Sequence, residues 1–413
     1  MRAGAEILRA REPLGWRLGL ERMHRLTSLL GMPQRRFASI HVVGTNGKTS
    51  VARMTAALLD AHGFPAGAYV SPHLADWRER MVIGGEPIAA EAFEDALVQA
   101  EQAAQAADRA AGEDGPVTQF ELVTAAAFVA LAAAKVKVGV IEAGLGGRLD
   151  ATNVIPSLAT VLTSVGLDHT DYLGETVGEI AGEKLAVLRD RSVLIHGALG
   201  PEAEAVAERA AAEHFAQTLV AGDPPAGLGE QMPPYQRRNL SLALAAAQLV
   251  AGELRSGAVA EALASLPVPG RAQVLAGEPT VVLDAAHNAD GARALAEALP
   301  GLIAPAERVA CCIAILEGKD AAVIIEAIAP WCAGVVCTEV PEDAIAAGGR
   351  PGGRSLPAEE LRRAFERHGV PARAEPDLDS GVRLAREQAV ELGVPLLVTG
   401  SHFLVGSAAA GLR

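Results

Sequence analysis

The sequence has few aromatic residues and no excess of basic charge. Its 413 residues include 8 Phe, 3 Tyr and 3 Trp, and 36 Lys and Arg stand against 50 Asp and Glu, which gives a net charge of −14 at pH 7. A dedicated nucleic-acid-binding protein needs a basic surface and aromatic side chains on which bases can stack. The composition therefore argues against a nucleic-acid partner, and an anionic ligand must meet a few locally placed cations.

Long apolar segments are also missing. The longest run without Asp, Glu, Lys or Arg spans 392–412, but Pro395, Gly400 and His402 interrupt it. The more apolar run 122–134 is shorter than the roughly 20 residues of a membrane span. The N-terminal segment is charged throughout, where a secretory signal would have an apolar core. We therefore expect no membrane partner and a cytoplasmic location.

Cysteine is rare, and its spacing is not that of a metal site. The four cysteines, Cys311, Cys312, Cys332 and Cys337, show no C-x-x-C pattern and lie in a stretch poor in histidine. We expect them to be small buried hydrophobic side chains of a protein in a reducing compartment.

Short β-branched runs alternate with Ala- and Leu-rich helical stretches along the chain, which predicts an α/β fold with a parallel sheet covered on both faces. Strands are predicted at 40–43, 137–142, 159–164, 280–284, 309–315, 334–338 and 395–399. Helices are predicted at 49–62, 89–111, 121–134, 234–251 and 291–298. A Pro- and Gly-rich stretch around Pro267 predicts a boundary between a larger domain, 1–267, and a smaller one, 268–413.

A glycine-rich segment follows the first of these strands. The residues of 44–50, GTNGKTS, stand between strand 40–43 and a helix, where loop N–H groups and the helix N-terminus can hold phosphate. Lys48 would meet the β and γ phosphates, and Thr49 or Ser50 would hold Mg²⁺. The loop is a variant, because a valine stands where the common pattern has its first glycine. The alternative is an ordinary strand-to-helix turn with an exposed lysine.

A second glycine-rich loop follows strand 137–142 but does not fit a dinucleotide site. The pattern G-x-G-x-x-G starting at Gly144 requires glycine at 149, where the chain has Leu149. What remains is Glu142 at the carboxyl end of a strand, where open α/β sheets bind ligands. A structural role for this carboxylate, such as a helix cap, is equally open.

Further charged residues follow the strand 159–164. Asp168 and His169 come just after it, and Lys184 lies on a predicted short helix, either in a site or as a solvated surface lysine. Strand ends that carry Lys48, Glu142 and His169 would meet at one edge of a parallel sheet, which favours a nucleotide–Mg²⁺ site.

Together these motifs resemble the folate branch of the Mur-type ATP-dependent amide ligases, folylpolyglutamate synthase and dihydrofolate synthase. GTNGKTS belongs to the wider superfamily, whereas SPHL at 71–74, EAGLGGRLDATNV at 142–154, LDH at 167–169 and DAAHN at 284–288 are more specific. The landmarks run in family order from about residue 17 to residue 405.

The resemblance implies an N-terminal P-loop ATPase-type domain with a parallel sheet and a smaller C-terminal Rossmann-like ligase domain. It implies a monomer that uses ATP and Mg²⁺ to add L-glutamate to the carboxylate of a folate or of dihydropteroate. The route is an acyl phosphate, and the products are ADP and phosphate. Another Mur-type ligase acting on a cell-wall precursor and a non-catalytic nucleotide-binding protein are the alternatives. Which of the two folate activities the chain has stays open.

The resemblance also implies the residues of the site. The catalytic residues are Lys48, Glu142, His169 and Lys184, the last as a carbamate. ATP contacts fall on Gly44, Thr45, Asn46, Gly47, Lys48, Thr49, Ser50, Asn239, Arg271 and Asp284. Metal ligands fall on Ser50, Ser71, Glu142 and His169. The pterin end of the substrate falls on Leu18, Gly19, Leu20, Phe120, Leu149, Asp150 and Ala151, and His287 and Asn288 would act in the C-terminal domain. No expectation is drawn for the structure of 190–234.

Overall fold

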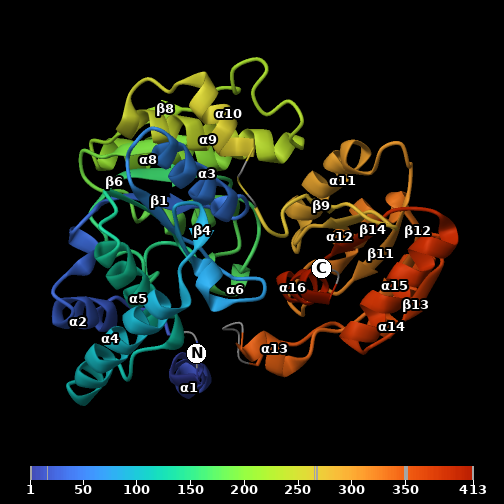
Figure 1. Cartoon of the computed structure of the whole chain (residues 1–413), viewed down its shortest axis with the longest axis horizontal. Helices are drawn as coiled ribbons and strands as arrows, with labels where there is room; N and C mark the ends of the chain where they lie inside the picture. The colour runs from blue at the N-terminus through green and yellow to red at the C-terminus, as the bar shows by residue number, and fades with distance from the viewer. Residues whose placement is uncertain (1, 16, 265, 267, 348–351, 412–413) are drawn as a thin grey trace. The chain divides into compact units, whose positions relative to one another are not determined.

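The computed structural model describes residues 2–15, 17–264, 266, 268–347 and 352–411. The chain forms two compact α/β units (Figure 1). Unit 1 comprises Met1–Pro72, Trp77–Glu230 and Gln236–Pro267, and unit 2 comprises His73–Asp76, Gln231–Tyr235 and Val268–Arg413. Pro267, where the sequence predicts the domain boundary, lies outside the described residues.

Unit 1 is built on an eight-stranded sheet of order β4-β3-β2-β5-β1-β6-β7-β8. Its strands are β1 (Ala38–Val43), β2 (Ala66–Tyr69), β3 (Met81–Ile83), β4 (Glu86–Pro87), β5 (Val138–Glu142), β6 (Ser157–Leu162), β7 (Val193–His196) and β8 (Gln217–Val220). The run from β2 to β8 is parallel, and only β3 and β4 pair antiparallel. Because β5, β1 and β6 are parallel neighbours, their carboxyl ends share one edge, as predicted.

The second part of unit 1 is its set of helices, of which α5 is the most deeply buried. They are α1 (Arg2–Arg11), α2 (Glu21–Leu29), α3 (Lys48–Ala61), α4 (Ala90–Arg109), α5 (Gln119–Ala133), α6 (Thr170–Leu173), α7 (Val177–Leu185), α8 (Pro201–Glu213), α9 (Pro234–Ala251) and α10 (Ser256–Ala264). Helix α5 is buried along most of its length, because its run of Ala, Leu, Val and Phe contributes to the core of the unit. It begins with a capping box in which Thr118 and Glu121 exchange hydrogen bonds, which satisfies donors of the first turn.

Unit 2 contains a six-stranded sheet of order β13-β12-β11-β14-β10-β9, in which only β9 is antiparallel. The strands are β9 (Gln273–Leu275), β10 (Val281–Leu283), β11 (Val309–Ile313), β12 (Cys332–Cys337), β13 (Ala372–Ala374) and β14 (Leu396–Thr399). The helices are α11 (Ala289–Ile303), α12 (Ala321–Ile328), α13 (Glu342–Ala347), α14 (Ala358–Arg367), α15 (Leu378–Leu392) and α16 (His402–Gly411). The four cysteines are free and buried in the cores on either side of this sheet, as predicted.

Three differences from the predicted elements have physical causes. Strand β2 was not predicted, because its sequence AGAY has no β-branched residue. The segment 190–234 contains β7, α8 and β8, so it continues the sheet. Helix α11 runs through Pro300 to Ile303 rather than ending at 298, because Leu299 and Ile303 are buried in the core. Among the residues that the structure describes, no helix is both long enough and apolar enough to cross a bilayer.

Candidate active site

The phosphate-binding loop lies between β1 and α3. Gly44 and Gly47 have φ angles of 149° and 88°, in the region that favours glycine. Side chains there would also collide with Thr163 and Asn239, respectively. The Lys48 Nζ donates to the carbonyl oxygens of Gly44 at 3.0 Å and Thr45 at 3.2 Å. The loop thus places a cation and a helix N-terminus together, which is an anion-binding arrangement.

Residues just after β6 fix the shape of this loop. The Ser164 carbonyl accepts from the Thr45 N–H at 2.8 Å, and the Ser164 Oγ accepts from the Asn46 N–H at 3.0 Å. The Thr163 Oγ donates to the Asn46 carbonyl at 2.6 Å. These bonds tie the loop to the neighbouring strand end, so its backbone is held before any ligand arrives.

Glu142 ends β5 beside the first turn of α3. Its carboxylate accepts from the Thr49 Oγ at 2.9 and 3.1 Å and from the Ser71 N–H at 3.0 Å, and the residue is 1% exposed. The neighbouring Ser50 Oγ is buried and has no hydrogen-bond partner. A buried carboxylate next to hydroxyl groups, one of them unsatisfied, is the oxygen-donor chemistry that Mg²⁺ requires.

The metal-binding residues expected from the sequence are Glu142 and His169 with the hydroxyls of Ser50 and Ser71, a set with only two charged or ring side chains. Among the described residues, no group of three or more His, Cys, Asp or Glu side chains is placed to hold a metal. His169 follows β6 with a φ of 52°, and its Nε2 lies 3.9 Å from the Asp168 carboxylate. A carboxylate with hydroxyl oxygens is a donor set that suits Mg²⁺.

Lys184 on α7 is buried beside the loop rather than solvated. Its Nζ donates to the Gly44 carbonyl at 3.0 Å, and the residue is 3% exposed. Burial, reinforced by the charge of Lys48, lowers the pKa of Lys184 to about 7, although Asp168 and Asp150 act in the opposite direction. The amine is therefore available in its neutral form near neutral pH, and the solvated alternative is wrong.

Four of the residues expected at the pterin end of the substrate, Phe120 and 149–151, lie in or against the loop that follows β5. The Phe120 ring packs on Gly144, where a Cβ atom would collide with it. Asp150 is buried, and its carboxylate accepts from the Leu145 N–H at 2.8 Å and from Thr152. Burial raises the pKa of the Asp150 carboxyl. Leu149 is 41% exposed.

The segment from Leu18 to Leu20 and residue Ala151 complete this expected set. Leu18 is 46% exposed, whereas Ala151 is buried in the core that also contains helix α5. Gly19 has a φ of 140° and lies directly before α2. Leu18 and Leu149 are therefore apolar side chains that are partly open to solvent.

Two buried arginines near Glu142 have no role assigned from the sequence. The Arg53 Nη2 donates to the Glu79 carbonyl at 3.1 Å, and the Arg80 guanidinium lies 4.2 Å from the centre of the Trp77 ring. Burial lowers the pKa of both guanidinium groups, and the charge of Glu142 acts against this in both. Arg53 stands four residues after Thr49 on α3, so helical spacing could have placed it on the same face.

Asn239 is the expected ATP contact on α9. Its side chain lies against Gly47 of the phosphate loop, and its amide donates to the Gln236 side-chain oxygen at 3.1 Å. The structure thus brings together, within unit 1, the loop 44–50, Asn239, Glu142 and Lys184.

The remaining expected residues belong to unit 2. Asp284 follows β10, and its carboxylate accepts from the Tyr235 hydroxyl at 2.5 Å, the Ala272 N–H at 2.7 Å and the Ala286 N–H at 2.9 Å. Burial raises the pKa of Asp284, and the positive charge of Arg271 opposes this rise. Tyr235 was not identified from the sequence, which has no local pattern that joins it to Asp284.

His287 and Asn288 follow Asp284 and take different positions. The His287 ring lies 4.6 Å from the His402 ring between centroids, and its Nδ1 is 2.9 Å from the Ala285 carbonyl oxygen. The Asn288 side chain accepts from the Gly291 N–H at 2.8 Å and caps α11. Asn288 therefore has a structural role in addition to any role in the reaction.

A glycine loop with its lysine, a buried strand-end carboxylate and a second buried lysine together define a P-loop ATP-dependent ligase. Residues 270–402 match the family model "Mur ligase, glutamate ligase domain". The chain is 36% identical to the dihydrofolate synthase/folylpolyglutamate synthase of Mycobacterium tuberculosis, over 94% of this chain and 89% of that protein.

Solved structures agree with these matches. The folylpolyglutamate synthase of Mycobacterium tuberculosis complexed with ADP has a TM-score of 0.87 and 31% identity, covering 99% of this chain and 98% of that one. Escherichia coli FolC in complex with DHPP and ADP has a TM-score of 0.84 and 27% identity, covering 100% of this chain and 97% of that one. The chain belongs to the folylpolyglutamate synthase/dihydrofolate synthase family of Mur-type ligases.

Proposed function

We propose that this chain uses ATP to join L-glutamate to the carboxylate of dihydropteroate or of a folate. One observation supports the proposal: the short segment from Glu142 to Gly144 contacts the phosphate loop at one end and Phe120 at the other, two parts of the expected substrate site. At one end Glu142 bonds Thr49 of the phosphate loop, and at the other Gly144 packs against Phe120. An aromatic ring system held by Phe120 would therefore extend toward the phosphates.

The chemistry needs an activated carboxylate, because amide formation from a carboxylate and an amine is uphill in water. A carboxylate oxygen attacks the γ phosphorus and ADP leaves, and the glutamate amine then displaces phosphate from the acyl phosphate. Lys48 and the loop N–H groups neutralise the transferred group. When bound, Mg²⁺ would supply further charge neutralisation, and Glu142, His169 and the hydroxyls of Ser50 and Ser71 would hold it.

Lys184 acts in this proposal as a carbamate. Its neutral amine attacks the carbon of CO₂ to form a C–N bond and releases one proton to solvent, so that a buried neutral amine becomes a carbamate anion. Burial next to Lys48 supports this role, because both features hold the amine neutral near pH 7. The anion would then lie beside the phosphate loop and close to Lys48, where it would help to orient the metal and its waters.

The proposal is tested by assaying purified protein with ATP, glutamate and either dihydropteroate or tetrahydrofolate, side by side. We expect ADP and phosphate only when a pterin substrate and glutamate are both present. Formation of AMP and pyrophosphate would contradict the acyl-phosphate route. ATP hydrolysis indifferent to both substrates would favour a non-catalytic nucleotide-binding protein, and turnover of a cell-wall precursor would favour the other ligase class.

We also propose that residues 1–267 form the ATP-binding domain, that 268–413 form the ligase domain, and that the enzyme is a cytoplasmic monomer. The phosphate loop in unit 1 and the family match over 270–402 support the division of roles. The four free, buried cysteines suit a reducing compartment. Light scattering, measured as the protein elutes from a size-exclusion column, should give the mass of one chain. A mass twice as large would contradict the monomer.

A further inference from the structure

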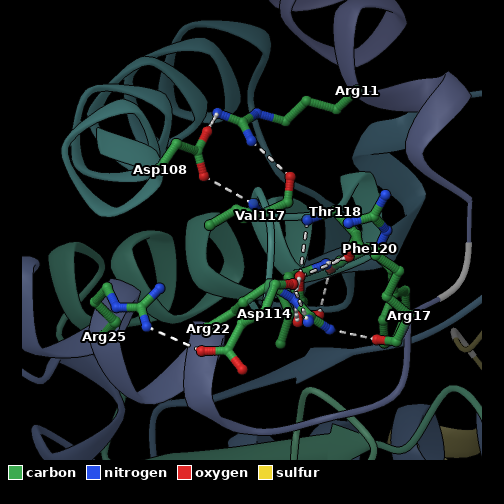
Figure 2. A network of polar contacts seen from close by, with 11 residues as sticks. Arg11, Arg17, Arg22, Arg25, Asp108, Asp114, Val117, Thr118 and Phe120 are labelled. Atoms are coloured by element: carbon green, nitrogen blue, oxygen red, sulfur yellow. Dashed lines mark hydrogen bonds and ion pairs between the residues drawn. The ribbon is translucent and has the colours of Figure 1, made fainter. Parts of the chain in front are cut away.

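A buried arginine links two regions of unit 1 that are far apart in the sequence, residues 17–22 and residues 114–121 (Figure 2). The Arg22 side chain on α2 is 5% exposed. Its Nε donates to the Glu121 carboxylate at 2.9 and 3.0 Å, its Nη1 to the Asp114 carbonyl at 2.9 Å and its Nη2 to the Arg17 carbonyl at 2.5 Å. One guanidinium therefore joins the chain before α2, the loop before α5 and α5 itself.

The carboxylate that faces Arg22 is also buried and hydrogen-bonded. The Glu121 side chain is 4% exposed, and its Oε2 also accepts from the Thr118 N–H and the Thr118 hydroxyl, both at 2.8 Å. Two buried charges are stable only when paired and hydrogen-bonded, and here both conditions are met. The pair is thus a rigid connection. Removal of either partner would leave the other charge buried without a partner.

The connected segments are the ones that carry the expected pterin contacts. Arg17 directly precedes the segment 18–20, and a Cβ on Gly19 would lie 3.8 and 3.9 Å from the two Nη atoms of Arg22, so this segment passes over the guanidinium. Glu121 directly follows Phe120, whose ring packs on Gly144. Arg22 therefore sets the position of the segment 18–20 relative to Phe120.

We propose that Arg22, through Glu121 and the Arg17 carbonyl, is a positioning residue that determines affinity for the pterin end of the substrate. This inference rests on the proposed function. Arg22 is assigned no contact with the substrate; it acts by holding the two walls that would. A lysine cannot replace it, because one ammonium cannot donate along the three directions that the planar guanidinium reaches.

A second buried arginine provides a matched control. The Arg11 side chain on α1 is 7% exposed, and it donates to the Glu101 carboxylate at 2.7 and 3.1 Å, to Asp108 at 3.0 Å and to the Val117 carbonyl at 2.6 Å. It resembles Arg22 in burial, charge and number of partners, but it fastens α1 to α4 and to Val117, which lies two residues before α5. None of these bonds reaches the segment 18–20 or the helix α5 itself.

The test compares Arg22→Lys, Arg22→Gln, Arg11→Lys and Arg11→Gln in the full chain, with kcat, the KM of each substrate and the melting temperature measured for every variant. We expect both Arg22 variants to raise the KM for the pterin substrate by about tenfold or more, which corresponds to a loss of about 1.4 kcal/mol in binding. The KM values for ATP and glutamate should change by less than about twofold. The Arg11 variants should lower the melting temperature without changing the KM for the pterin substrate.

Three outcomes separate the possible failures. An Arg22→Lys enzyme with the parental KM for the pterin substrate would overturn the inference while leaving the proposed function intact. Equal losses in all three KM values, or the same KM change in the Arg11 variants, would reduce Arg22 to a stabilising role and also overturn it. A parent enzyme without turnover of any pteroate or folate would overturn the proposed function and this inference with it. If Arg22→Gln does not fold, Arg22→Lys decides the matter, because it keeps the charge opposite Glu121.

Discussion

The two units carry the same feature in different surroundings: an acidic residue at the carboxyl end of a central parallel strand. Glu142 after β5 bonds a threonine hydroxyl and one N–H, and it faces a glycine loop with a lysine. Asp284 after β10 is held by two backbone N–H groups and the Tyr235 hydroxyl. Asp284 satisfies two backbone N–H groups and a hydroxyl, whereas Glu142 satisfies one backbone N–H and a hydroxyl, so we expect the fold to depend more on Asp284 than on Glu142.

The largest expected effect comes from the loop beside Glu142. Lys48→Ala should lower turnover by on the order of 10²- to 10³-fold, the usual cost of deleting one strong donor to the transition state. The melting temperature should stay the same, because glycines and bonds from Thr163 and Ser164 shape the loop. Steady-state kinetics with a melting curve check this. Activity within a few-fold of the parent, at unchanged stability, would mean that Lys48 does not act on the phosphates.

Lys184 should be the next most sensitive position. Lys184→Ala should lose most activity and recover part of it with added acetate, which can take the place of the carbamate, whereas Lys184→Arg should stay inactive because its charge has the wrong sign. Exposed Lys135 provides the matched control, and Lys135→Ala should behave like the parent. A fully active Lys184→Arg enzyme would contradict the carbamate.

The pH dependence of the carbamate follows from the lowered pKa of Lys184. Because the pKa in the folded protein is about 7, the amine is mainly neutral above pH 7 and is protonated as the pH falls through that value. Removal of bicarbonate should therefore reduce activity at pH 8, and restored bicarbonate should rescue it less well at pH 6. Activity that is indifferent to bicarbonate at pH 8, in a protein without the added mass of CO₂, would exclude the modification.

A pair of substitutions tests the comparison between the two carboxylates directly. Asp284→Ala should lower the free energy of unfolding by about 1–3 kcal/mol, because it leaves buried donors unpaired. Glu142→Ala should affect turnover far more than stability, because the Thr49 hydroxyl can turn to another acceptor or to water. Denaturant unfolding and steady-state kinetics on both variants check this. Equal losses of stability would mean that Glu142 is held for the fold as firmly as Asp284.

The smallest expected effect belongs to Tyr235. Tyr235→Phe removes one of the three donors to Asp284, so the free energy of unfolding should fall by about 0.5–1.5 kcal/mol. The change is measurable by denaturant unfolding, and Tyr172→Phe, at a tyrosine that is 54% exposed, should lower the free energy of unfolding by less. An unchanged Tyr235→Phe enzyme would mean that water replaces the hydroxyl at Asp284.

Local patterns in the sequence predicted the strands that end at functional loops. The β-branched runs of β1, β5 and β6 and the glycines after them were visible, and their parallel order then brings Lys48, Glu142 and His169 to one edge of the sheet. Strand β2 was missed, because four residues without a β-branched side chain become a strand only through neighbours already in place. Tertiary packing likewise decided the end of α11.

Long-range pairing is the part that the sequence could not predict. Arg22 and Glu121 are 99 residues apart, and Tyr235 is 49 residues from Asp284. Nothing in the spacing of single residues reveals such partners, because the fold alone brings them together. The burial of Lys184 was open for the same reason: a lysine on a short helix is ordinarily solvated, and only the packing of α7 beside the phosphate loop removes it from water.

At the centre of the proposed reaction, the phosphate loop of unit 1 converts the pterin substrate's carboxylate into an acyl phosphate. Dihydropteroate labelled with ¹⁸O in its carboxylate, incubated with ATP and L-glutamate, tests it most directly. We expect each phosphate released to carry one labelled oxygen and ADP to carry none. The label is detected by mass spectrometry or by the isotope shift of the phosphorus resonance. Phosphate without label, or label appearing in AMP, would contradict it.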